Sequence, residues 1–538
     1  NGTEAFTNLT DAQGNIQRQI LTEYIHTPSG MDYTDYNNYT VHANLSGYTN
    51  ATQEINLTES KSVYLTLGPA CGTLDTADKV YTLISNVSSD GTCFTIGANN
   101  ITLDGNGYTI NYSQTSAGNA INDAGGYDDL TIKDCEIFQG GNSANSNAIH
   151  IVNSDYAIIY NNTIETNDDS ATDTKRGVYL DNSDYANISK NTINTYSDLY
   201  TEGIYATFSY NLSITNNTIT TEDEFSPAIY LSGSNTANSG TYIGNNVLSS
   251  ENYVSHTLHL YYYSYATVYD NNMTISGSGE TSALSIFHGR YNNISKNILT
   301  SMGGNSAYGL IFDNAKENTV VDTVIDANGE DDVLVKGSND FTNYLINSTF
   351  NQSKAGFLTS TDKIKVQWYL DVYVNDSVGG AVESANVTAW QNNGTESFTN
   401  LTDASGNIQR QILTEYTQNM TAKYYTDYNN YTVNATKGST ESTAEVNLTG
   451  NKAIYFTISG VTSCDTLSDA DTTYTLLGNV SSDGTCFSIG ANNITIDCNG
   501  YTINYSQTSA GYGVYISGKN DTTVKNCNIV QGSSSGDA

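Results

Sequence analysis

The stretch Asn100-Ile-Thr-Leu-Asp-Gly-Asn-Gly-Tyr-Thr-Ile110 alternates polar with apolar residues and is interrupted by glycine at positions 105 and 107. It returns almost unchanged at residues 493–503. Between the two copies, the ending of the stretch recurs in steps of 27, 27, 29, 26, 29, 25, 26, 26 and 25 residues, counted from Ile110. A nearly constant step of this size predicts a repeat architecture.

Each repeat contains two recognisable short strands. One resembles Ile188-Ser-Lys-Asn-Thr-Ile193, with apolar residues five positions apart, and the other resembles Gly177-Val-Tyr-Leu180. Strands this short cannot bury an apolar face alone, but similar turns stacked on one another form a continuous core. We therefore predict an all-β chain in which residues 71–362 form a parallel β-helix of about ten coils, with residues 71–99 as its disulfide-closed N-terminal cap.

Two large segments of the sequence occur twice. The segment NGTEAFTNLTDAQGNIQRQILTEY begins at Asn1 and returns at Asn393, and residues 81–118 return at 474–511, with offsets of 392 and 393. Residues 363–459 contain several strands separated by turn residues, which predicts a β-sandwich. Residues 1–67 repeat the later part of this sandwich without its first strands, and we expect this partial sandwich to expose an unpaired strand edge. Residues 464–538 begin a second β-helix with two turns, so β-helices and β-sandwiches are predicted to alternate in a tandem array.

The composition agrees with many short strands. Hydrophobic residues make up 38% of the 538 residues and only 3 are Pro, while Gly, Asn, Thr, Ser and Tyr are abundant. Such residues suit strands joined by Asn and Gly turns. The net charge of -36 repels nucleic acid and anionic lipid, so neither is an expected partner. No run of roughly 18 apolar residues predicts a membrane span.

The cysteines predict disulfide bonds. Cys71 and Cys93 have the same 22-residue spacing as Cys464 and Cys486 in equivalent sequence, which indicates one disulfide made twice. A loop of that size implies about 3 kcal/mol in the chain-entropy model. Cys498 and Cys527 fall near matching points of successive repeats and are expected to be stacked neighbours. In the first copy Gly105 stands in place of Cys498, so Cys135 is left single, and no Cys/His pattern typical of zinc is present.

The chain also holds about thirty Asn-x-Ser/Thr sequons. Representative acceptors for N-glycosylation are Asn8, Asn44, Asn86, Asn187, Asn293 and Asn447. This density together with disulfides predicts an exported, extracellular and glycosylated protein at the cell surface.

A family resemblance follows from these motifs. Cys71 to Cys93-Phe-Thr-Ile, the stretch 100–110, Asn187-Ile-Ser-Lys-Asn-Thr-Ile193 and Val524-Lys-Asn-Cys-Asn-Ile529 resemble NosD-like right-handed parallel β-helix repeats of archaeal cell-surface proteins. The resemblance covers residues 71–362 and 464–538 and implies a right-handed β-helix. The sandwich resembles immunoglobulin-like or carboxypeptidase-regulatory-like modules. The NosD name implies copper, but six scattered histidines and 4 methionines do not predict a copper site.

Three carboxylate pairs are candidates for catalytic or metal sites. They are Asp128 with Asp129, Asp168 with Asp169, and Asp331 with Asp332, and His288-Gly289-Arg290 resembles an element of polygalacturonases. A glycoside hydrolase needs two carboxylates at a defined separation, whereas these pairs lie many repeats apart in turn-like sequence. We interpret them as solvated turn residues. No cofactor is predicted, and calcium at Glu222-Asp223-Glu224 or Glu330-Asp331-Asp332 is an alternative without a defined binding loop.

Aromatic residues give the sharpest binding signal. If Ile149, Val178, Ile204, Ile229 and Leu258 form one inward column, the residues that follow form an outward one: His150, Tyr179, Tyr205, Tyr230 and His259. A second column is suggested by Tyr156, Tyr185, Tyr265 and Tyr291. Such a strip could contact a glycan or another protomer, or it could only brace the stacked strands.

These observations predict a structural protein without enzymatic activity. We expect a glycosylated subunit of an extracellular polymer, such as a surface array, sheath or filamentous appendage, that self-associates through its β-helix and β-sandwich. The alternative is an adhesin or carbohydrate-binding surface protein, with polysaccharide as the partner of the aromatic strip. A polysaccharide lyase or hydrolase is the third reading.

Overall fold

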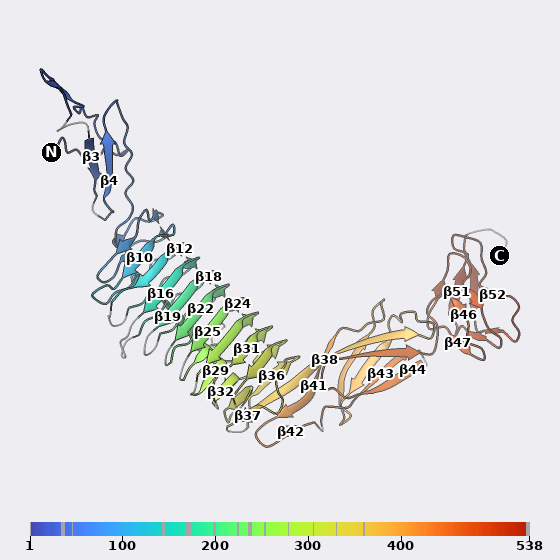
Figure 1. Cartoon of the computed structure of the whole chain (residues 1–538). Helices are drawn as coiled ribbons and strands as arrows, with labels where there is room; N and C mark the ends of the chain where they lie inside the picture. The colour runs from blue at the N-terminus through green and yellow to red at the C-terminus, as the bar shows by residue number, and fades with distance from the viewer. Residues whose placement is uncertain are drawn as a thin grey trace. The chain divides into compact units, whose positions relative to one another are not determined.

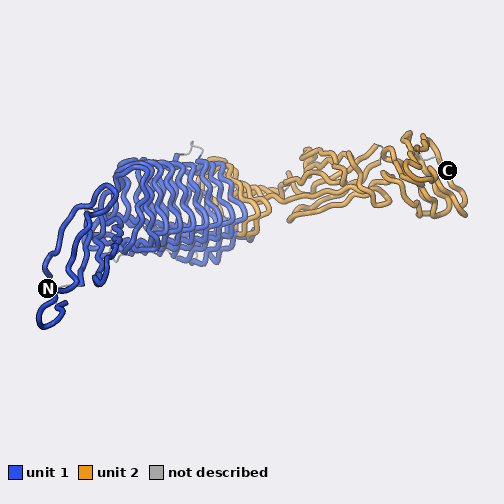
Figure 2. The backbone as a smooth tube through the Cα atoms, turned by 90° about the horizontal axis from the view of Figure 1, so that it is seen from above, with its two compact units in different colours: residues 1–313, 325–333, 351–354 blue, residues 314–324, 334–350, 355–538 orange. Residues whose placement is uncertain are grey.

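The computed structural model describes residues 2–33, 38–45, 47–141, 146–167, 174–196, 201–222, 225–234, 239–251, 254–277, 279–304, 306–329, 331–358, 361–425, 427–438 and 440–533. These residues form strands and turns and contain no helix, so the predicted all-β class is confirmed (Figure 1). None of them forms a helix long and apolar enough to cross a membrane. The chain divides into two compact units, residues 1–313, 325–333 and 351–354 as unit 1 and residues 314–324, 334–350 and 355–538 as unit 2 (Figure 2).

Each coil of the β-helix has three strand positions, here called I, II and III in chain order. Position I is occupied by β5 (Gly72–Leu74), β8 (Phe94–Ile96), β11 (Ile121–Asp123), β14 (Ile149–Val152), β17 (Val178–Asp181), β20 (Ile204–Thr207), β23 (Ile229–Ser232), β26 (His256–Tyr261), β29 (Thr281–Phe287), β32 (Ala307–Asp313), β35 (Val333–Lys336) and β37 (Ala355–Phe357). Position II is occupied by β6 (Val80–Thr82), β9 (Thr102–Asp104), β12 (Thr131–Lys133), β15 (Ile158–Tyr160), β18 (Asn187–Ser189), β21 (Ser213–Thr215), β24 (Tyr242–Gly244), β27 (Thr267–Tyr269), β30 (Asn293–Ser295), β33 (Thr319–Val321) and β36 (Thr342–Ile346). Position III is occupied by β7 (Val87–Ser88), β10 (Thr109–Tyr112), β13 (Glu136–Gln139), β16 (Thr163–Asn167), β19 (Thr192–Tyr196), β22 (Thr218–Glu222), β25 (Val247–Glu251), β28 (Asn272–Ser276), β31 (Ile298–Ser301) and β34 (Val324–Ala327).

The described part of the chain has twelve strands at position I of this β-helix, so the predicted number of about ten coils is too low. The first missed coil is β5 to β7, which pairs in parallel with β8 to β10. The sequence predicts residues 71–99 to be a cap, because this coil lacks the Thr-Ile ending that marks the others. The other missed strand is β37, which follows the last recurring ending at residues 349–350.

Neighbouring coils of unit 1 pair in parallel and in register. Ile110 pairs with Ile137 and Ile137 with Ile164 at position III, and all three side chains are completely buried. Alternate residues point outward, because successive side chains of a strand lie on opposite faces. The turn after position II places a residue in the left-handed region, such as Asn161 and Asn216. Asn tolerates this conformation better than most residues, which helps to account for the Asn-rich composition.

Residues 1–67 contain two antiparallel hairpins in unit 1. They are β1 (Ile25–Thr27) with β2 (Gly30–Asp32), and β3 (Asn38–Ala43) with β4 (Ala51–Asn56). Residues 2–24 form no strand. Their apolar side chains, such as Leu9 and Ile20, are exposed.

The corresponding later segment, in unit 2, forms two facing sheets. One sheet has β40 (Glu396–Leu401), β39 (Asn386–Trp390), β43 (Tyr431–Lys437) and β44 (Thr440–Val446), and the other has β42 (Lys423–Tyr424), β41 (Gln411–Gln418), β38 (Lys363–Asp376) and β45 (Lys452–Ile458). Val372 and Val374 of one sheet and Val387 and Val433 of the other share one buried core. This segment is a β-sandwich.

A second β-helix follows in unit 2. It has β46 (Thr466–Leu467), β49 (Phe487–Ile489) and β52 (Val514–Ile516) at position I, β47 (Thr473–Thr475), β50 (Thr495–Asp497) and β53 (Thr523–Lys525) at position II, and β48 (Val480–Ser481), β51 (Thr502–Tyr505) and β54 (Asn528–Gln531) at position III. Residues 464–533 thus hold three strands at each position, one more than the two turns predicted. Phe487, Ile496 and Ile503 form its buried core.

Candidate binding surface of the β-helix

The predicted outward column forms along position I of unit 1. His150 pairs with Tyr179, Tyr179 with Tyr205, Tyr205 with Tyr230, and Tyr230 with His259. The residues that precede them, from Ile149 to Leu258, are completely buried. The five outward rings are partly exposed and are called the aromatic strip below.

The rings of the aromatic strip contact one another. The centroids of Tyr205 and Tyr230 are 5.0 Å apart with an interplanar angle of 5°, and those of His150 and Tyr179 are 5.1 Å apart at 26°. Tyr179 and Tyr205 are tilted, and Tyr230 meets His259 edge-on at 5.0 Å. Because the ring faces are turned largely toward neighbouring rings, a ligand would meet mainly ring edges and polar tips.

Arg176 binds to the middle of the aromatic strip. Its guanidinium carbon lies 4.1 Å from the ring centroid of Tyr205 and 4.9 Å from that of Tyr179, within the range of cation–π contacts. Its Nε donates a hydrogen bond of 2.9 Å to Oε2 of Glu202. Burial raises the pKa of the Glu202 carboxyl, while the charge of Arg176 opposes this shift. The cation therefore fixes the two tyrosines and the buried acid in one arrangement.

One end of the strip is an aromatic cluster around His259. The rings of His256 and His259 meet edge-on at 4.7 Å, and Nδ1 of His256 lies 2.8 Å from the Ser282 hydroxyl. Burial lowers the pKa of His259 to about 3, so its imidazole is neutral at physiological pH. His288 lies in the next coil, where its ring stacks on that of Tyr262 with centroids 4.6 Å apart.

The second predicted column forms as two separate pairs. Tyr156 stacks on Tyr185 at 4.9 Å and Tyr265 stacks on Tyr291 at 5.1 Å. All four have positive φ between 55° and 62°, because they lie in the turn between positions I and II. The turn residues between the two pairs are Asn211 and Gly240, so the column is interrupted.

A buried asparagine ladder was not predicted. It lies in the turn between positions II and III and comprises Asn162, Asn191, Asn217, Asn246, Asn271 and Asn297. Nδ2 of Asn191 donates to the Ile159 carbonyl (2.9 Å) and to Oδ1 of Asn217 (3.0 Å), whose oxygen also accepts the Asn191 backbone N–H. The sequence signal that could have predicted the ladder is the Asn between the two isoleucines of 188–193, which recurs in other coils. Because this ladder satisfies buried polar groups, it stabilises the fold.

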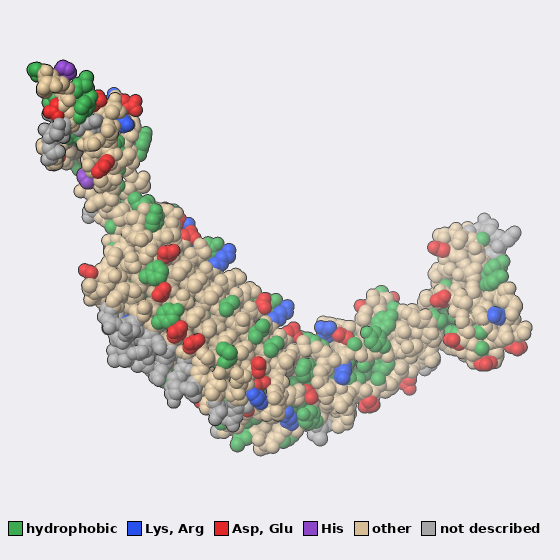
Figure 3. Space-filling view, viewed as in Figure 1, with side chains coloured by type: hydrophobic (Ala, Val, Ile, Leu, Met, Phe, Trp, Pro, Cys, Tyr) green, Lys and Arg blue, Asp and Glu red, His purple; other side chains and the backbone are tan. Residues whose placement is uncertain are grey.

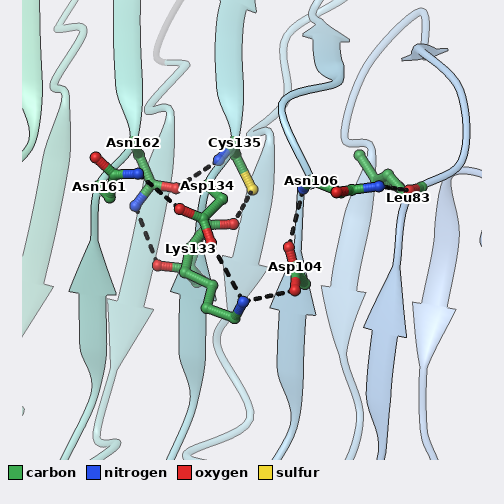
Figure 4. A network of polar contacts seen from close by, with 9 residues as sticks. Leu83, Asp104, Asn106, Lys133, Asp134, Cys135, Asn161 and Asn162 are labelled. Atoms are coloured by element: carbon green, nitrogen blue, oxygen red, sulfur yellow. Dashed lines mark hydrogen bonds and ion pairs between the residues drawn. The ribbon is translucent and has the colours of Figure 1, made fainter.

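Cys135 occupies the same column one coil before Asn162 (Figure 4). Its backbone N–H donates to Oδ1 of Asn162 at 3.0 Å, and Nδ2 of Asn162 donates to the Ile132 carbonyl. Burial raises the pKa of the Cys135 thiol to about 12, so the thiolate form is suppressed. Lys133 beside it forms ion pairs with Asp104 and, at 3.2 Å, with Asp134.

The disulfides Cys71–Cys93, Cys464–Cys486 and Cys498–Cys527 are all present, and Cys135 is free. The six representative sequon residues Asn8, Asn44, Asn86, Asn187, Asn293 and Asn447 are all exposed. Within the first β-helix, sequons lie at positions II and III or in their turns, as at Asn187, Asn272 and Asn216, whereas the strands of position I contain none. The face that carries the aromatic strip is therefore free of glycan acceptors.

Among the described residues, Asp128 and Asp332 of the predicted acidic pairs accept hydrogen bonds from backbone N–H groups. Oδ1 of Asp128 accepts the Asp155 backbone N–H at 2.8 Å. The buried Asp332 accepts the backbone N–H groups of Ala327 and Asn351, at 3.2 and 2.6 Å. Asp168 with Asp169, and the residues Asp223, Glu224 and Glu330 of the alternative calcium sites, lie outside the described residues. Acidic side chains are spread over the face seen in Figure 3.

Two family models match the chain. Residues 80–248 match the right-handed β-helix region, and residues 171–381 match a family described as periplasmic copper-binding protein (NosD). No curated protein matches.

Solved structures similar to this chain include the DFA-IIIase of Arthrobacter chlorophenolicus A6 without its lid. The match has 12% sequence identity and a TM-score of 0.29, and it covers 52% of this chain and 74% of that one. The mannuronan C-5 epimerase AlgE4 A-module of Azotobacter vinelandii matches at 14% identity over 54% and 77% of the two chains, with a TM-score of 0.28. Tailspike protein 3 of bacteriophage CBA120 matches at 13% identity over 54% and 51%, with a TM-score of 0.26.

The donor set does not fit a copper site. Copper prefers imidazole, thiolate or thioether ligands. His256 and His259 are the two histidines in ring contact, but His256 lies within hydrogen-bond distance of Ser282 and His259 packs against the rings of Tyr230 and Tyr261. Within the described ranges, no group of three or more His, Cys, Asp or Glu side chains is placed to hold a metal ion.

Proposed function

We propose that this chain, which matches the right-handed β-helix region over residues 80–248 and the NosD family over residues 171–381, is a structural subunit of an extracellular surface polymer, such as an array, sheath or filamentous appendage. The subunit carries out no catalysis and self-associates through its β-helix and β-sandwich. Disulfides support an oxidising location outside the cytoplasm. The exposed sequons support a glycosylated exterior.

Strand β38 is the main structural support for this proposal. β38 runs without interruption from the first β-helix into the sandwich: residues 342–346 pair in parallel with 363–367, and residues 452–458 pair with 370–376. At its far end the buried Asp376 carboxylate accepts hydrogen bonds from the backbone N–H and the hydroxyl of Thr462, both 2.7 Å, just before the second β-helix. Domains joined by shared strands and buried hydrogen bonds, instead of a flexible linker, suit a scaffold that bears load.

The aromatic strip is the proposed contact between subunits. It lies on the face that carries no sequon, so N-glycans on the other two faces would leave it accessible. Tyrosine is enriched in protein interfaces because it offers both an apolar ring and a hydroxyl. The tips of Tyr179, Tyr205 and Tyr230 would form the contact, since their faces are in contact with one another.

The test is the assembly state of the full disulfide-bonded chain. Electron microscopy and sedimentation should show regular polymers, and Tyr179→Ser with Tyr205→Ser should leave folded monomers of 58.0 kDa. Tyr160→Ser with Tyr269→Ser is the matched control, because these tyrosines lie at position II and also contact a lysine each. A wild-type chain that remains monomeric at every concentration would overturn the proposal.

A glycan-binding adhesin is the second candidate, supported by the partly exposed tyrosines of the aromatic strip. A glycan array with the full chain tests it. Binding that disappears in the Tyr179→Ser, Tyr205→Ser variant, while the wild-type chain forms no polymer, would favour the adhesin over the scaffold.

A further inference from the structure

A β-bulge in the sandwich directs one carboxylate toward a groove. Along the antiparallel pair of β38 and β41, Val366 pairs with Tyr416 and Gln367 pairs with Thr414, so Glu415 is the extra residue of the bulge. Its side chain is only 3% exposed, and its Oε2 accepts a hydrogen bond of 2.6 Å from Nε1 of Trp368. Bulges of this kind redirect a side chain and are frequent beside functional sites.

The groove above Glu415 has a volume of about 390 Å³, within the range of small-molecule sites. It is lined by Asn392, Glu415, Tyr425, Asn429, Asn430, Asn447 and Thr449. Asn429 fixes one wall, since its Nδ2 donates to Oδ1 of Asn447 (2.9 Å) and its Oδ1 accepts the Leu448 N–H (2.6 Å). Tyr425 remains exposed at the rim. The groove thus combines fixed amides, one acceptor carboxylate and one aromatic ring.

Six of the seven lining residues, from Glu415 to Thr449, recur in the earlier copy of the sandwich sequence. Residues 425–433 repeat residues 33–41 without a change, Glu415 corresponds to Glu23, and Asn447-Leu-Thr449 corresponds to Asn56-Leu-Thr58. In contrast, residues 417–424 share no identity with 25–32, and residues 434–446 differ from 42–55 in length. The sequence segments that line the groove are therefore kept, while the segments between them have changed.

We propose that this groove binds a neutral saccharide. Vicinal hydroxyls match amides and a carboxylate, which donate and accept hydrogen bonds, and the apolar face of a sugar ring matches Tyr425. An anionic ligand would meet the Glu415 carboxylate and the negative charge of the chain. A divalent cation would find a single carboxylate. The saccharide can be the glycan on the sequon at Asn430 or Asn447, or a separate glycan.

The experiment uses the full chain made with and without N-glycosylation and measures binding of N-acetylglucosamine and of glucuronic acid by saturation-transfer NMR and calorimetry. We expect the unglycosylated chain to bind N-acetylglucosamine and to reject the acidic sugar. If the native glycan occupies the groove, the glycosylated chain will not bind the free sugar. If a separate glycan is the ligand, both preparations will bind it equally.

Tyr425→Ala and Glu415→Gln should each weaken binding at least tenfold. Tyr424→Ala is the matched control, because this neighbouring tyrosine is exposed to the same extent but does not line the groove. Tyr425→Ala lies at the rim and is expected to leave the circular dichroism unchanged, so it tests the site even if Glu415→Gln disturbs the sandwich. No binding by the unglycosylated chain, or equal loss with Tyr424→Ala, would overturn the proposal.

Discussion

Residues 1–24 and 33–41 have nearly the same sequence as residues 393–416 and 425–433, but their burial differs. Ile16 is 38% exposed whereas its counterpart Ile408 is 7% exposed, and Tyr24 is 37% exposed whereas Tyr416 is fully buried. In the later copy these residues pack beside β38, a strand supplied by residues 363–376. The burial of these residues in the later copy therefore depends on contact with β38.

Local interactions, in contrast, are the same in both copies. The Tyr39 hydroxyl donates to the Thr22 carbonyl at 2.8 Å and accepts the Thr22 N–H at 3.1 Å, and Tyr431 does the same with Thr414 at 2.8 and 3.0 Å. The hairpin of β3 and β4 also corresponds to that of β43 and β44. Short-range hydrogen bonds thus form without the core, while burial requires strands that are distant in sequence.

The largest expected effect comes from giving residues 1–67 a partner strand equivalent to β38. Fusing residues 363–392 directly before Asn1 should convert residues 1–67 into a second cooperative sandwich, with a free energy of unfolding of about 5 kcal/mol, as for small domains. Hydrogen exchange of the amides of residues 16–24 measures this. The control is the same fusion with Val372→Asp and Val374→Asp, which removes the core face of the strand. Equal exchange with and without the intact fusion would show that the local sequence of the two copies differs in folding ability.

A matched pair of leucines gives the next largest effect. Leu413 is buried in the sandwich core, and its counterpart Leu21 is only partly buried. Leu413→Ala should destabilise the sandwich by about 2–5 kcal/mol, because it leaves a cavity. Leu21→Ala should cost less than about 1 kcal/mol, as at surface positions. Chemical denaturation followed by Trp368 and Trp390 fluorescence reports on the sandwich, and equal costs would contradict the comparison.

The same distinction explains what could be predicted from sequence. The step from Ile110 to Ile137 and Ile164 predicted coils in register, because an inward residue must return once in every turn. The column from His150 to His259 followed from that register. The coil of β5 to β7 was not predicted, since it lacks the Thr-Ile ending by which the other coils were recognised. The contact of ring faces in the aromatic strip, the hydrogen bonds of the Asn ladder and the Glu415 groove depend on side-chain positions that periodicity does not specify.

The two β-helices also differ in how one column of stacked turn residues, between positions II and III, is joined from coil to coil. In the first β-helix this column contains Gly105, Cys135 and Asn162, and the Cys135 backbone N–H donates a hydrogen bond to Oδ1 of Asn162. In the second β-helix the column contains Cys498 and Cys527, which form a disulfide. Cys498→Gly copies the first β-helix into the second. It should destabilise the second β-helix by about 3 kcal/mol, from the chain-entropy cost of losing a loop of about 30 residues. Limited proteolysis of residues 464–533 measures the loss, and reduction of the wild-type chain should reproduce it in part.

The reverse change, Gly105→Cys, should have the smallest effect. A new disulfide with Cys135 would close an equivalent loop, but a Cβ at position 105 would lie 2.5 Å from the Asp134 carbonyl oxygen and from the Cα of Cys135. The backbone must shift to accept it, so the gain should fall below the loss caused by Cys498→Gly, at about 1–2 kcal/mol. Iodoacetamide provides the readout: with its pKa raised to about 12 by burial, Cys135 should be labelled in the wild type only on unfolding, and in the variant only after reduction as well. A gain equal to the loss in the second β-helix would mean that the two columns have the same backbone geometry, and that glycine at position 105 reflects no steric constraint.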